Sequence, residues 1–528
     1  MHFGLTLLMA MIAVAALVAA GLTLLVARLT HPRPRGPHPH STALIAPSDA
    51  TIPRAFAAPL QDRPGQCALH PLTDPLDALA ARLELIEAAE TAIDLQYYIW
   101  QNDIAGALML DALRRAAARG VRVRLLLDDN GTAGLDETLS AFARREHIEV
   151  RLFNPFPIRG ARVLGYLSDF RRLNRRMHNK AMVVDGTIAI VGGRNVGDDY
   201  FNNFAPGGLY MDLDLAVAGP VVSDIARAFD AFWNTPASLP APLLLRPVSE
   251  ARAEALRAGE AARLSRLEAA AYRESLAAAR AGALILGPDA PEPIFAEAHF
   301  LSDPPDKIHG GRRGSDLLWH ALRKTLGQPR EELVLMTPYL VPTRQGTKAL
   351  ARFAKAGIRV KVLTNSFAAT DVPLVHSGYA HRRRPLLRAG IQLFEYAPDA
   401  ETRRTPGDFI SRRIKGTSPF SRNKLHAKVF AVDRVRVFVG SFNFDPRSMR
   451  LNTENGLVVS SPELAAEISD AFEHYIPERA WEVKLAPLGG RLMWHRPGQP
   501  ALRHEPNASI GSRVILGIAQ RLPIEWML

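Results

Sequence analysis

One short pattern of residues occurs twice in this 528-residue chain. Each copy has a histidine, a lysine two positions later and an aspartate five positions beyond the lysine, in the segments MHNKAMVVDG and LHAKVFAVDR. An asparagine follows 17 positions after each histidine, and further on an acidic residue stands eight positions before a proline. The matched residues are His178, Lys180, Asp185, Asn195 and Asp212 in the first copy, and His426, Lys428, Asp433, Asn443 and Glu454 in the second. This repetition indicates two related units in one chain.

The segments that precede the two motifs repeat as well. Residues 92–100 are apolar and aromatic, and they are followed by a segment of helical period and by the apolar residues 120–129. Residues 332–341, 346–357 and 357–366 repeat that order. In both copies a glycine, Gly120 or Gly357, stands where a helix commonly ends. The alternation predicts an α/β fold of two repeats, each a mainly parallel sheet flanked by helices.

The spacing of the motif suits a chemical site on a strand. Alternate residues of a strand point to the same side, so His-x-Lys directs an imidazole and an ammonium toward one spot. Lysine and asparagine side chains are suited to bind an anionic tetrahedral group such as phosphate. A single His-x-Lys occurs often by chance, and a lone histidine is usually a surface residue. The prediction therefore depends on the repetition of the whole pattern.

The N-terminus is the most apolar part of the chain. No charged residue occurs from Phe3 to Ala27, and a helix of that length would span roughly 37 Å, enough to cross a bilayer. The segment is longer than the apolar core of a signal peptide, so we expect an uncleaved anchor. Arg28, Arg33 and Arg35 follow it, which predicts a cytoplasmic location for the remaining chain.

These features divide the chain into six parts. The boundaries that we predict are a transmembrane anchor at 1–30, a Pro/His-rich tether at 31–70, a first repeat at 71–236, a helical linker at 237–292, a second repeat at 293–485 and a C-terminal extension at 486–528 that docks on the fold.

The two motifs, together with the segments RLFNPF, VGGRNVGDDYF and LPIEWML, resemble the phospholipase D superfamily and, within it, bacterial cardiolipin synthases of the C type. The resemblance implies two repeats packed about a pseudo-twofold axis, with both histidines facing one phosphodiester. It implies that His178 attacks phosphorus and that His426 serves as acid and base, although the reverse assignment stays open. It requires no cofactor and no metal.

The resemblance also implies roles for the other motif residues. Lys180, Lys428, Asn195 and Asn443 would bind the phosphoryl oxygens, and Asp212 and Glu454 would each orient a histidine. Asp185 and Asp433 would organise the motif structurally. The second copy has Ser441, a further candidate donor to phosphate, where the first copy has Gly193, so the two half-sites are expected to be unequal.

The activity implied is transfer of a phosphatidyl group to phosphatidylglycerol, from phosphatidylglycerol or phosphatidylethanolamine, at a bacterial inner membrane. Two other enzyme activities of the superfamily remain open, hydrolysis of phospholipids to phosphatidic acid and cleavage of nucleic acid. The net charge of +12 permits any anionic partner, although the apolar N-terminus favours lipid over nucleic acid. A lipid-binding protein without activity is a fourth alternative.

Two further groups of charged residues are less informative. The carboxylates Asp128, Asp129, Asp198 and Asp199 are more typical of capping or solvated loop positions than of a cation site. The arginine runs are either contacts for lipid phosphates or a solvated basic surface, and they consist of Arg171, Arg172, Arg175 and Arg176 in the first copy and Arg382, Arg383 and Arg384 in the second.

Overall fold

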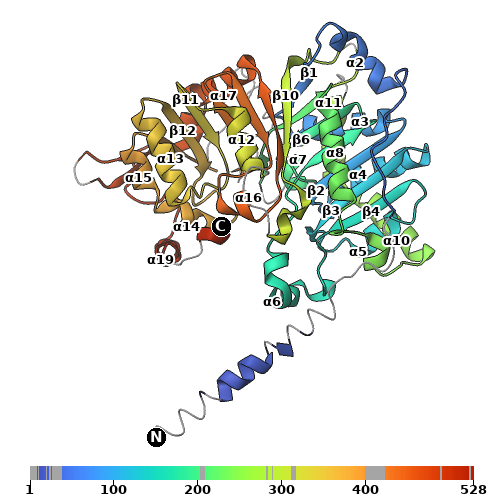
Figure 1. Ribbon diagram of the computed structural model, residues 1–528, viewed down its shortest axis with the longest axis horizontal. Helices are drawn as coiled ribbons and strands as arrows, with labels where there is room; N and C mark the ends of the chain where they lie inside the picture. The colour runs from blue at the N-terminus through green and yellow to red at the C-terminus, as the bar shows by residue number, and fades with distance from the viewer. Residues whose placement is uncertain are drawn as a thin grey trace.

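The computed structural model describes residues 9, 11–19, 21–22, 25, 39–201, 208–280, 284–287, 289–310, 317–398, 423–487, 490–521 and 525–528. Figure 1 shows two α/β halves side by side, the first in blue to green and the second in yellow to red. The predicted anchor lies largely outside the described residues. Among the residues that are described, no helix is long and apolar enough to span a bilayer.

The first repeat is built on an eight-stranded sheet in the order β9-β4-β3-β2-β5-β6-β8-β1. Its strands are β1 (Cys67–Leu72), β2 (Ala92–Ile99), β3 (Arg122–Gly131), β4 (Ile148–Phe153), β5 (Ala181–Val184), β6 (Ile188–Gly192), β8 (Asp214–Ala218) and β9 (Ser238–Pro240). The helices up to the linker are α2 (Thr51–Gln61), α3 (Pro75–Ala88), α4 (Ile104–Ala118), α5 (Asp136–Phe142), α6 (Arg162–Leu173), α7 (Asp198–Phe201), α8 (Val222–Trp233) and α9 (Ala241–Leu244), with the short helix η1 (Arg159–Ala161).

The second repeat has the corresponding strand order. Read from the junction with the first repeat outward, it is β10-β17-β16-β15-β11-β12-β13-β18-β19. Its strands are β10 (Ile294–Ser302), β11 (Glu332–Met336), β12 (Arg359–Asn365), β13 (Gln392–Tyr396), β15 (Val429–Val432), β16 (Arg436–Gly440), β17 (Asn455–Ser460), β18 (Ala480–Leu485) and β19 (Leu492–His495). Its helices are η2 (Pro305–His309), α12 (Leu318–Leu326), α13 (Thr343–Lys355), α14 (Pro373–Ala380), α15 (Arg383–Arg388), α16 (Pro446–Arg450), α17 (Pro462–His474), α18 (Ile476–Arg479), α19 (Ile510–Ala519) and η3 (Glu525–Met527).

The two sheets join edge to edge. Strand β1 pairs antiparallel with β10, with Ala68 opposite Phe295, so the strands form one continuous sheet across the middle of the molecule. A cluster of buried apolar side chains from both repeats lies at this junction, with Val183 and Val191 from the first and Val429 and Val439 from the second. The related strand orders on either side agree with the two repeats predicted from the sequence.

The expectation of a mainly parallel sheet was wrong, because each repeat is mixed. Only β2, β3 and β4, and likewise β11, β12 and β13, run parallel. The strand after each histidine turns back at once through a tight turn, at Asp185-Gly186 in the first repeat, and a hairpin of this kind can only be antiparallel.

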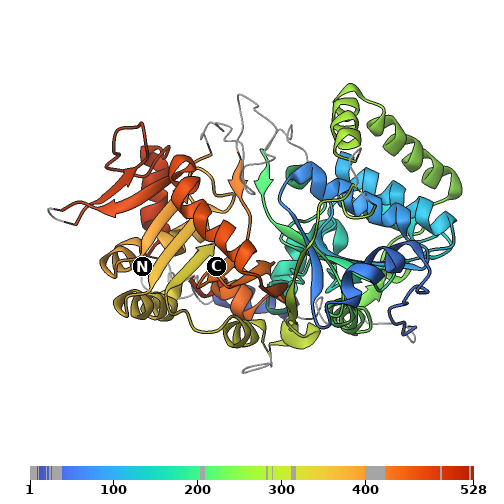
Figure 2. The same ribbon diagram turned by 90° about the horizontal axis from the view of Figure 1, so that it is seen from above.

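The linker and the C-terminal extension both pack on the repeats. The linker helices α10 (Glu250–Leu264) and α11 (Leu267–Arg280) lie on the outside of the first repeat, away from the second (Figure 2). The C-terminal extension adds β19 beside β18, and its helix α19 contacts α14. The carboxylate of Glu525 in η3 forms an ion pair with Arg382.

Candidate active site

The two motifs meet because each histidine segment pairs with the acidic segment of the other repeat. The short strand β7 (Tyr210–Met211) pairs in parallel with β14 (Lys424–Leu425), and the backbone N–H of His426 donates to the carbonyl of Met211. In the other pair of segments, the N–H of His178 donates to the carbonyl of Thr453. Backbone hydrogen bonds between the repeats therefore hold both histidines in place.

His178 is oriented by an acidic side chain of the second repeat. Its Nδ1 lies 2.8 Å from Oε2 of Glu454, a carboxylate with no solvent exposure. The hydroxyl of Ser441 donates to the same oxygen at 2.5 Å and accepts a hydrogen bond from the N–H of Asn455. With Nδ1 engaged as a donor, the Nε2 lone pair of a neutral His178 is left for chemistry.

His426 is held in the corresponding way, by an acidic side chain of the first repeat. Its Nδ1 is hydrogen-bonded to Oδ2 of Asp212, which belongs to the first repeat. The Nζ of Lys428 lies 2.9 Å from Nδ1 and 3.2 Å from Nε2 of the same ring. Each histidine is thus matched to the acid of the other copy, which the spacing of the motifs does not reveal.

The difference between Gly193 and Ser441 has a structural reason. A Cβ atom at Gly193 would overlap the carboxylate of Asp212, so no side chain fits there. Glutamate has one more methylene than aspartate, and the hydroxyl of Ser441 contacts the carboxylate of Glu454. Ser441 was expected to donate to phosphate. The structure directs its hydroxyl to Glu454, which makes it a positioning residue for His178.

The lysines and asparagines of the motif lie beside the histidines with different partners. The Nζ of Lys180 donates to the carbonyl of His178 at 2.6 Å. The amide of Asn195 has a protein partner on each atom, since its Nδ2 donates to the hydroxyl of Tyr200 and its Oδ1 accepts from the N–H of Ile99. To contact phosphate as expected, Asn195 would have to bind it in addition to these protein partners or in place of them.

Asn443 differs from Asn195 in this respect. Its buried Oδ1 has no hydrogen-bond partner among the described residues, whereas its backbone N–H donates to the hydroxyl of Ser448. A buried unpaired amide atom is unfavourable unless a ligand or water meets it. Because this oxygen can only accept, Asn443 is placed to receive a hydrogen bond from a hydroxyl of the substrate or from water.

The two motif aspartates face away from the histidines. Asp185 accepts hydrogen bonds from the N–H groups of Glu90, Thr91 and Ala92, at the start of β2. Asp433 accepts the equivalent bonds from residues 330–332, at the start of β11. Both aspartates adopt positive φ angles, 53° and 54°, at the turn that follows the histidine strand. They fix the position of that strand in the sheet.

Burial sets the protonation of the site. It lowers the pKa of His178 to about 4 against the opposing pull of Glu454, and it lowers that of His426 to about 4 with help from Lys428. Burial also lowers the pKa of Lys180 to about 7. Burial would raise the pKa of Asp212, but Lys428 and His426 outweigh it and lower that pKa to about 2. Both histidines are therefore neutral near pH 7.

The carboxylates considered as a cation site have protein partners. Asp128 forms an ion pair with Arg176 and accepts the N–H of Met177, and Asp129 forms an ion pair with Arg159. Asp198 accepts two N–H groups at the start of α4. The described residues contain no cluster of three or more groups suited to hold a metal.

Both interpretations of the arginine runs were wrong for their buried members. Arg176 is buried against Asp128, and Arg383 is buried between Glu395 and Glu505, so neither can reach a lipid or bulk solvent. Arg171 and Arg384 are the members of the two runs that are exposed.

Two stretches of the chain, residues 83–233 and 322–476, match the family described as cardiolipin synthase, PLD-like domain. The chain belongs to this family. It is 43% identical to cardiolipin synthase C of Escherichia coli strain K12 over 490 residues, which cover 90% of this chain and 100% of that protein. It is 26% identical over 413 residues to cardiolipin synthase B of the same strain, covering 76% and 81% of the two chains.

The fold is similar to that of phosphatidylserine synthase from Haemophilus influenzae Rd KW20. The TM-score is 0.55 at 16% sequence identity, and the likeness covers 90% of this chain and 100% of that one. At this identity the likeness shows the fold alone. Together, the family match and the relatives confirm the resemblance to cardiolipin synthases of the C type.

Several aromatic residues of this PLD-like site were missed from the sequence. The ring of Tyr98 packs edge-on against His178, with centroids 5.1 Å apart, and Tyr200 and Tyr210 pack against His426 at 5.3 and 5.0 Å. Tyr98 lies in the apolar strand before the motif, where it is typical of a core residue. Only its place at the carboxyl end of that strand hinted at a role.

Proposed function

We propose that this protein is a phosphatidyltransferase that makes cardiolipin by passing a phosphatidyl group to phosphatidylglycerol. The observation that supports this most strongly is the pair of histidines, each oriented by a buried carboxylate of the other repeat. Two such groups around one phosphodiester permit covalent catalysis combined with acid–base catalysis. The kinship with cardiolipin synthase C favours lipid substrates.

In the first step, Nε2 of His178 attacks phosphorus and forms a P–N bond. The P–O bond to the leaving alcohol breaks, and the alcohol oxygen takes a proton from His426. Formation of the P–N bond leaves the ring of His178 positively charged. The Nδ1 proton of this ring stays directed at Glu454, whose carboxylate offsets the charge. An anionic phosphodiester between the histidines raises the pKa of His426 enough for it to carry that proton.

In the second step, a hydroxyl of phosphatidylglycerol gives its proton to His426 and attacks phosphorus, and the P–N bond breaks. Lys180, Lys428 and Asn443 offset the charge on the phosphoryl oxygens in both steps. The leaving alcohol is glycerol when phosphatidylglycerol is the donor and ethanolamine when phosphatidylethanolamine is the donor. With water in place of the second hydroxyl, the same machinery would release phosphatidic acid.

The full-length protein in vesicles of phosphatidylglycerol, with and without phosphatidylethanolamine, tests this proposal. We expect cardiolipin by mass spectrometry with the wild-type protein, and none with His178→Ala or His426→Ala. A yield that depends on phosphatidylethanolamine identifies the donor. Phosphatidic acid as the sole product would replace transfer by hydrolysis, and an unchanged lipid composition would refute lipid chemistry altogether.

We also propose that the protein is anchored in the bacterial inner membrane, in a single pass, by its apolar N-terminus, with the catalytic repeats on the cytoplasmic side. Exposed apolar side chains support contact with lipid. Val163 and Leu164 on α6 are 76% and 53% exposed, and Leu374 on α14 and Ile518 on α19 are 49% and 57% exposed. Helices α6, α14 and α19 lie on the same side of the molecule in Figure 1.

The matched substitutions Val163→Asp and Val435→Asp test this lipid contact. Val435 is also exposed, at 43%, but lies in the turn between β15 and β16. We expect Val163→Asp to weaken co-sedimentation of the full chain with vesicles and Val435→Asp to leave it unchanged. Equal effects of the two substitutions would contradict the assignment of this side. Labelling of introduced cysteines from either side of the membrane tests the topology.

A further inference from the structure

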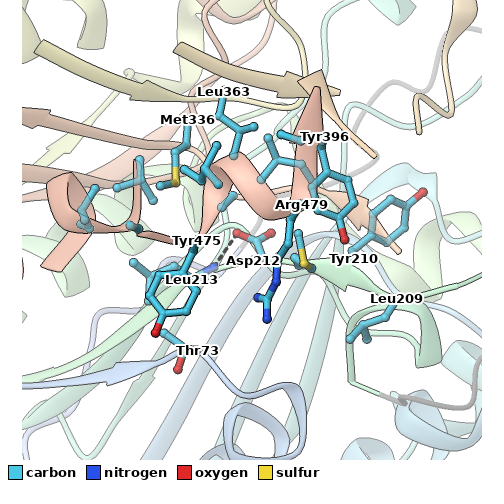
Figure 3. Close-up of a pocket in the computed structure, with 18 of the residues that line it drawn as sticks. Thr73, Leu209, Tyr210, Asp212, Leu213, Met336, Leu363, Tyr396, Tyr475 and Arg479 are labelled. Carbon is cyan, nitrogen blue, oxygen red and sulfur yellow. Dashed lines mark hydrogen bonds between the residues drawn. The ribbon is translucent and has the colours of Figure 1, made fainter. Parts of the chain in front are cut away.

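The second repeat contains a cavity where the first repeat is filled. The cavity has a volume of about 130 Å3, is partly open to solvent and lies where the repeats meet. Figure 3 shows its wall, which is mostly apolar and includes Met336, Leu363 and Leu213, with Thr73 and Arg479 among the polar members. Apolar cavities of this order bind apolar molecules.

The strand register identifies the equivalent place in the first repeat. Arg122 on β3 and Arg359 on β12 begin matching strands, so Leu363 takes the place of Leu126. By the pairing of the next strand, Tyr396 takes the place of Phe153. In the first repeat these positions belong to a closed cluster of buried side chains, made of Leu126, Phe153, Met177, Phe229, Phe232, Trp233 and Ile308.

The difference arises on the helix that covers the site. Phe229 on α8 stands nine residues after Pro220, and Ala471 on α17 stands nine residues after Pro462. In the first repeat Phe229 stacks on Trp233 with centroids 5.7 Å apart and fills the space. In the second repeat the equivalent position has only the methyl group of Ala471, which lines the cavity.

The cavity is next to the proposed chemistry. Asp212 and Tyr210 both line it, and both contact His426, Asp212 by a hydrogen bond to Nδ1 and Tyr210 by its ring. A molecule in the cavity is therefore separated from His426 by a single layer of side chains. Beside His178, the equivalent place is taken by the buried cluster that contains Met177.

We propose that this cavity binds one acyl chain of the phospholipid that occupies the His426 half of the site. The inference depends on the proposed function only in requiring a lipid substrate, and it holds for transfer and hydrolysis alike. A mostly apolar wall suits a hydrocarbon chain, and a chain there gains dispersion contacts with that wall. The unequal halves of the site then hold their two lipids differently, with the acyl chain anchored on one side only.

Ala471→Phe tests the proposal, because it introduces the side chain that fills the equivalent place in the first repeat. We expect at least ~10-fold slower turnover of lipids with 16- and 18-carbon chains, and turnover of the soluble diester bis(4-nitrophenyl) phosphate within about twofold of wild type. Ala466→Phe is the matched control, because it makes the same substitution on a partly exposed side of α17 that does not line the cavity. It should alter neither rate. Equal turnover of long-chain lipids by Ala471→Phe and wild type would overturn the proposal.

A binding measurement decides the case in which Ala471→Phe loses both activities. Full-length His178→Ala protein in vesicles is irradiated with phosphatidylglycerol that has a diazirine at the end of one acyl chain. We expect cross-links in the peptides that contain Ala471, Tyr475 and Leu363, and their loss in the double variant with Ala471→Phe. Cross-links confined to other peptides would refute the acyl-chain site. Because cross-linking needs no turnover, this result would be distinguishable from a lack of phosphatidyl transfer.

Discussion

At the scale of single residues, the two acids that orient the histidines have equivalent tasks. Asp212 and Glu454 are buried, and each holds a proton on Nδ1 of the histidine from the other repeat. Replacing a carboxylate with an amide keeps the shape but removes the charge that stabilises an imidazolium. We expect Asp212→Asn and Glu454→Gln each to lower kcat at least ~100-fold at unchanged melting temperature.

Initial rates of lipid conversion measure this effect, and Asp224→Asn is the control, since Asp224 is a surface carboxylate paired with Arg227. A loss of less than twofold in either catalytic variant would show that the hydrogen bonds between the repeats do not support the chemistry.

Gly193 and Ser441 provide a paired test of the unequal half-sites. A methyl group at Gly193 would collide with the carboxylate of Asp212, whereas Ser441→Ala removes one hydrogen bond to Glu454. We expect Ser441→Ala to slow turnover about tenfold, equivalent to about 1.4 kcal/mol, and Gly193→Ala to slow it considerably more. Steady-state kinetics of both variants would contradict this account if Gly193→Ala proved the milder one.

At the scale of the elements, Asp185 and Asp433 each join a histidine strand to its neighbour. Each carboxylate accepts backbone N–H groups from three consecutive residues at the start of the adjacent strand, but Asp185 is fully buried while Asp433 is half-buried. We expect Asp185→Ala to lower the free energy of unfolding by about 3–5 kcal/mol and Asp433→Ala by less, because exposed N–H groups regain water. Denaturant titration measures both, and the reverse order would contradict the structural role.

The sequence predicted the elements better than their directions. The apolar runs at β2, β3, β11 and β12 and the glycines that end the helices before β3 and β12 were sufficient to predict two α/β repeats. The hairpin after each histidine was the source of error, because a turn of three residues reverses the chain whatever the surrounding alternation of strands and helices suggests. Arg176 and Arg383 were misread because their ion-pair partners are distant in sequence.

At the scale of the whole molecule, the site exists only between the repeats. The motif spacing predicted that both histidines and both acids belong to the site. It did not predict that Glu454 pairs with His178 and Asp212 with His426, because this depends on how two segments distant in sequence pair. The cavity beside Ala471 was hidden for the same reason, since it becomes visible only when the packed equivalent around Phe229 is known.

Burial of both histidines also couples the stability of the whole fold to pH. Their folded pKa of about 4 lies below the ordinary 6.5, so the unfolded chain binds more protons between these values. Their contribution to stability is complete above pH 6.5 and is lost as the pH falls toward 4, by up to about 3 kcal/mol for each histidine.

Comparison of the unfolding free energy of the wild type and of His178→Gln/His426→Gln between pH 7 and pH 4.5 isolates this effect. Asp74, Asp198 and Asp445, whose pKa burial raises to about 6, titrate in the same range in both proteins and cancel. We expect the wild type to lose more stability than the double variant on acidification. Parallel pH profiles would contradict the neutral state of the histidines.

The central claim is that a phosphatidyl group passes through a covalent bond to His178. The direct measurement is peptide mass spectrometry of the full-length protein, quenched at alkaline pH after seconds of contact with phosphatidylglycerol vesicles. We predict a phosphatidyl adduct on the peptide that contains His178 in the wild type, a slower build-up of this adduct in His426→Ala, which cannot protonate the leaving alcohol, and no adduct in His178→Ala. An adduct on His426 that persists in His178→Ala would contradict the account.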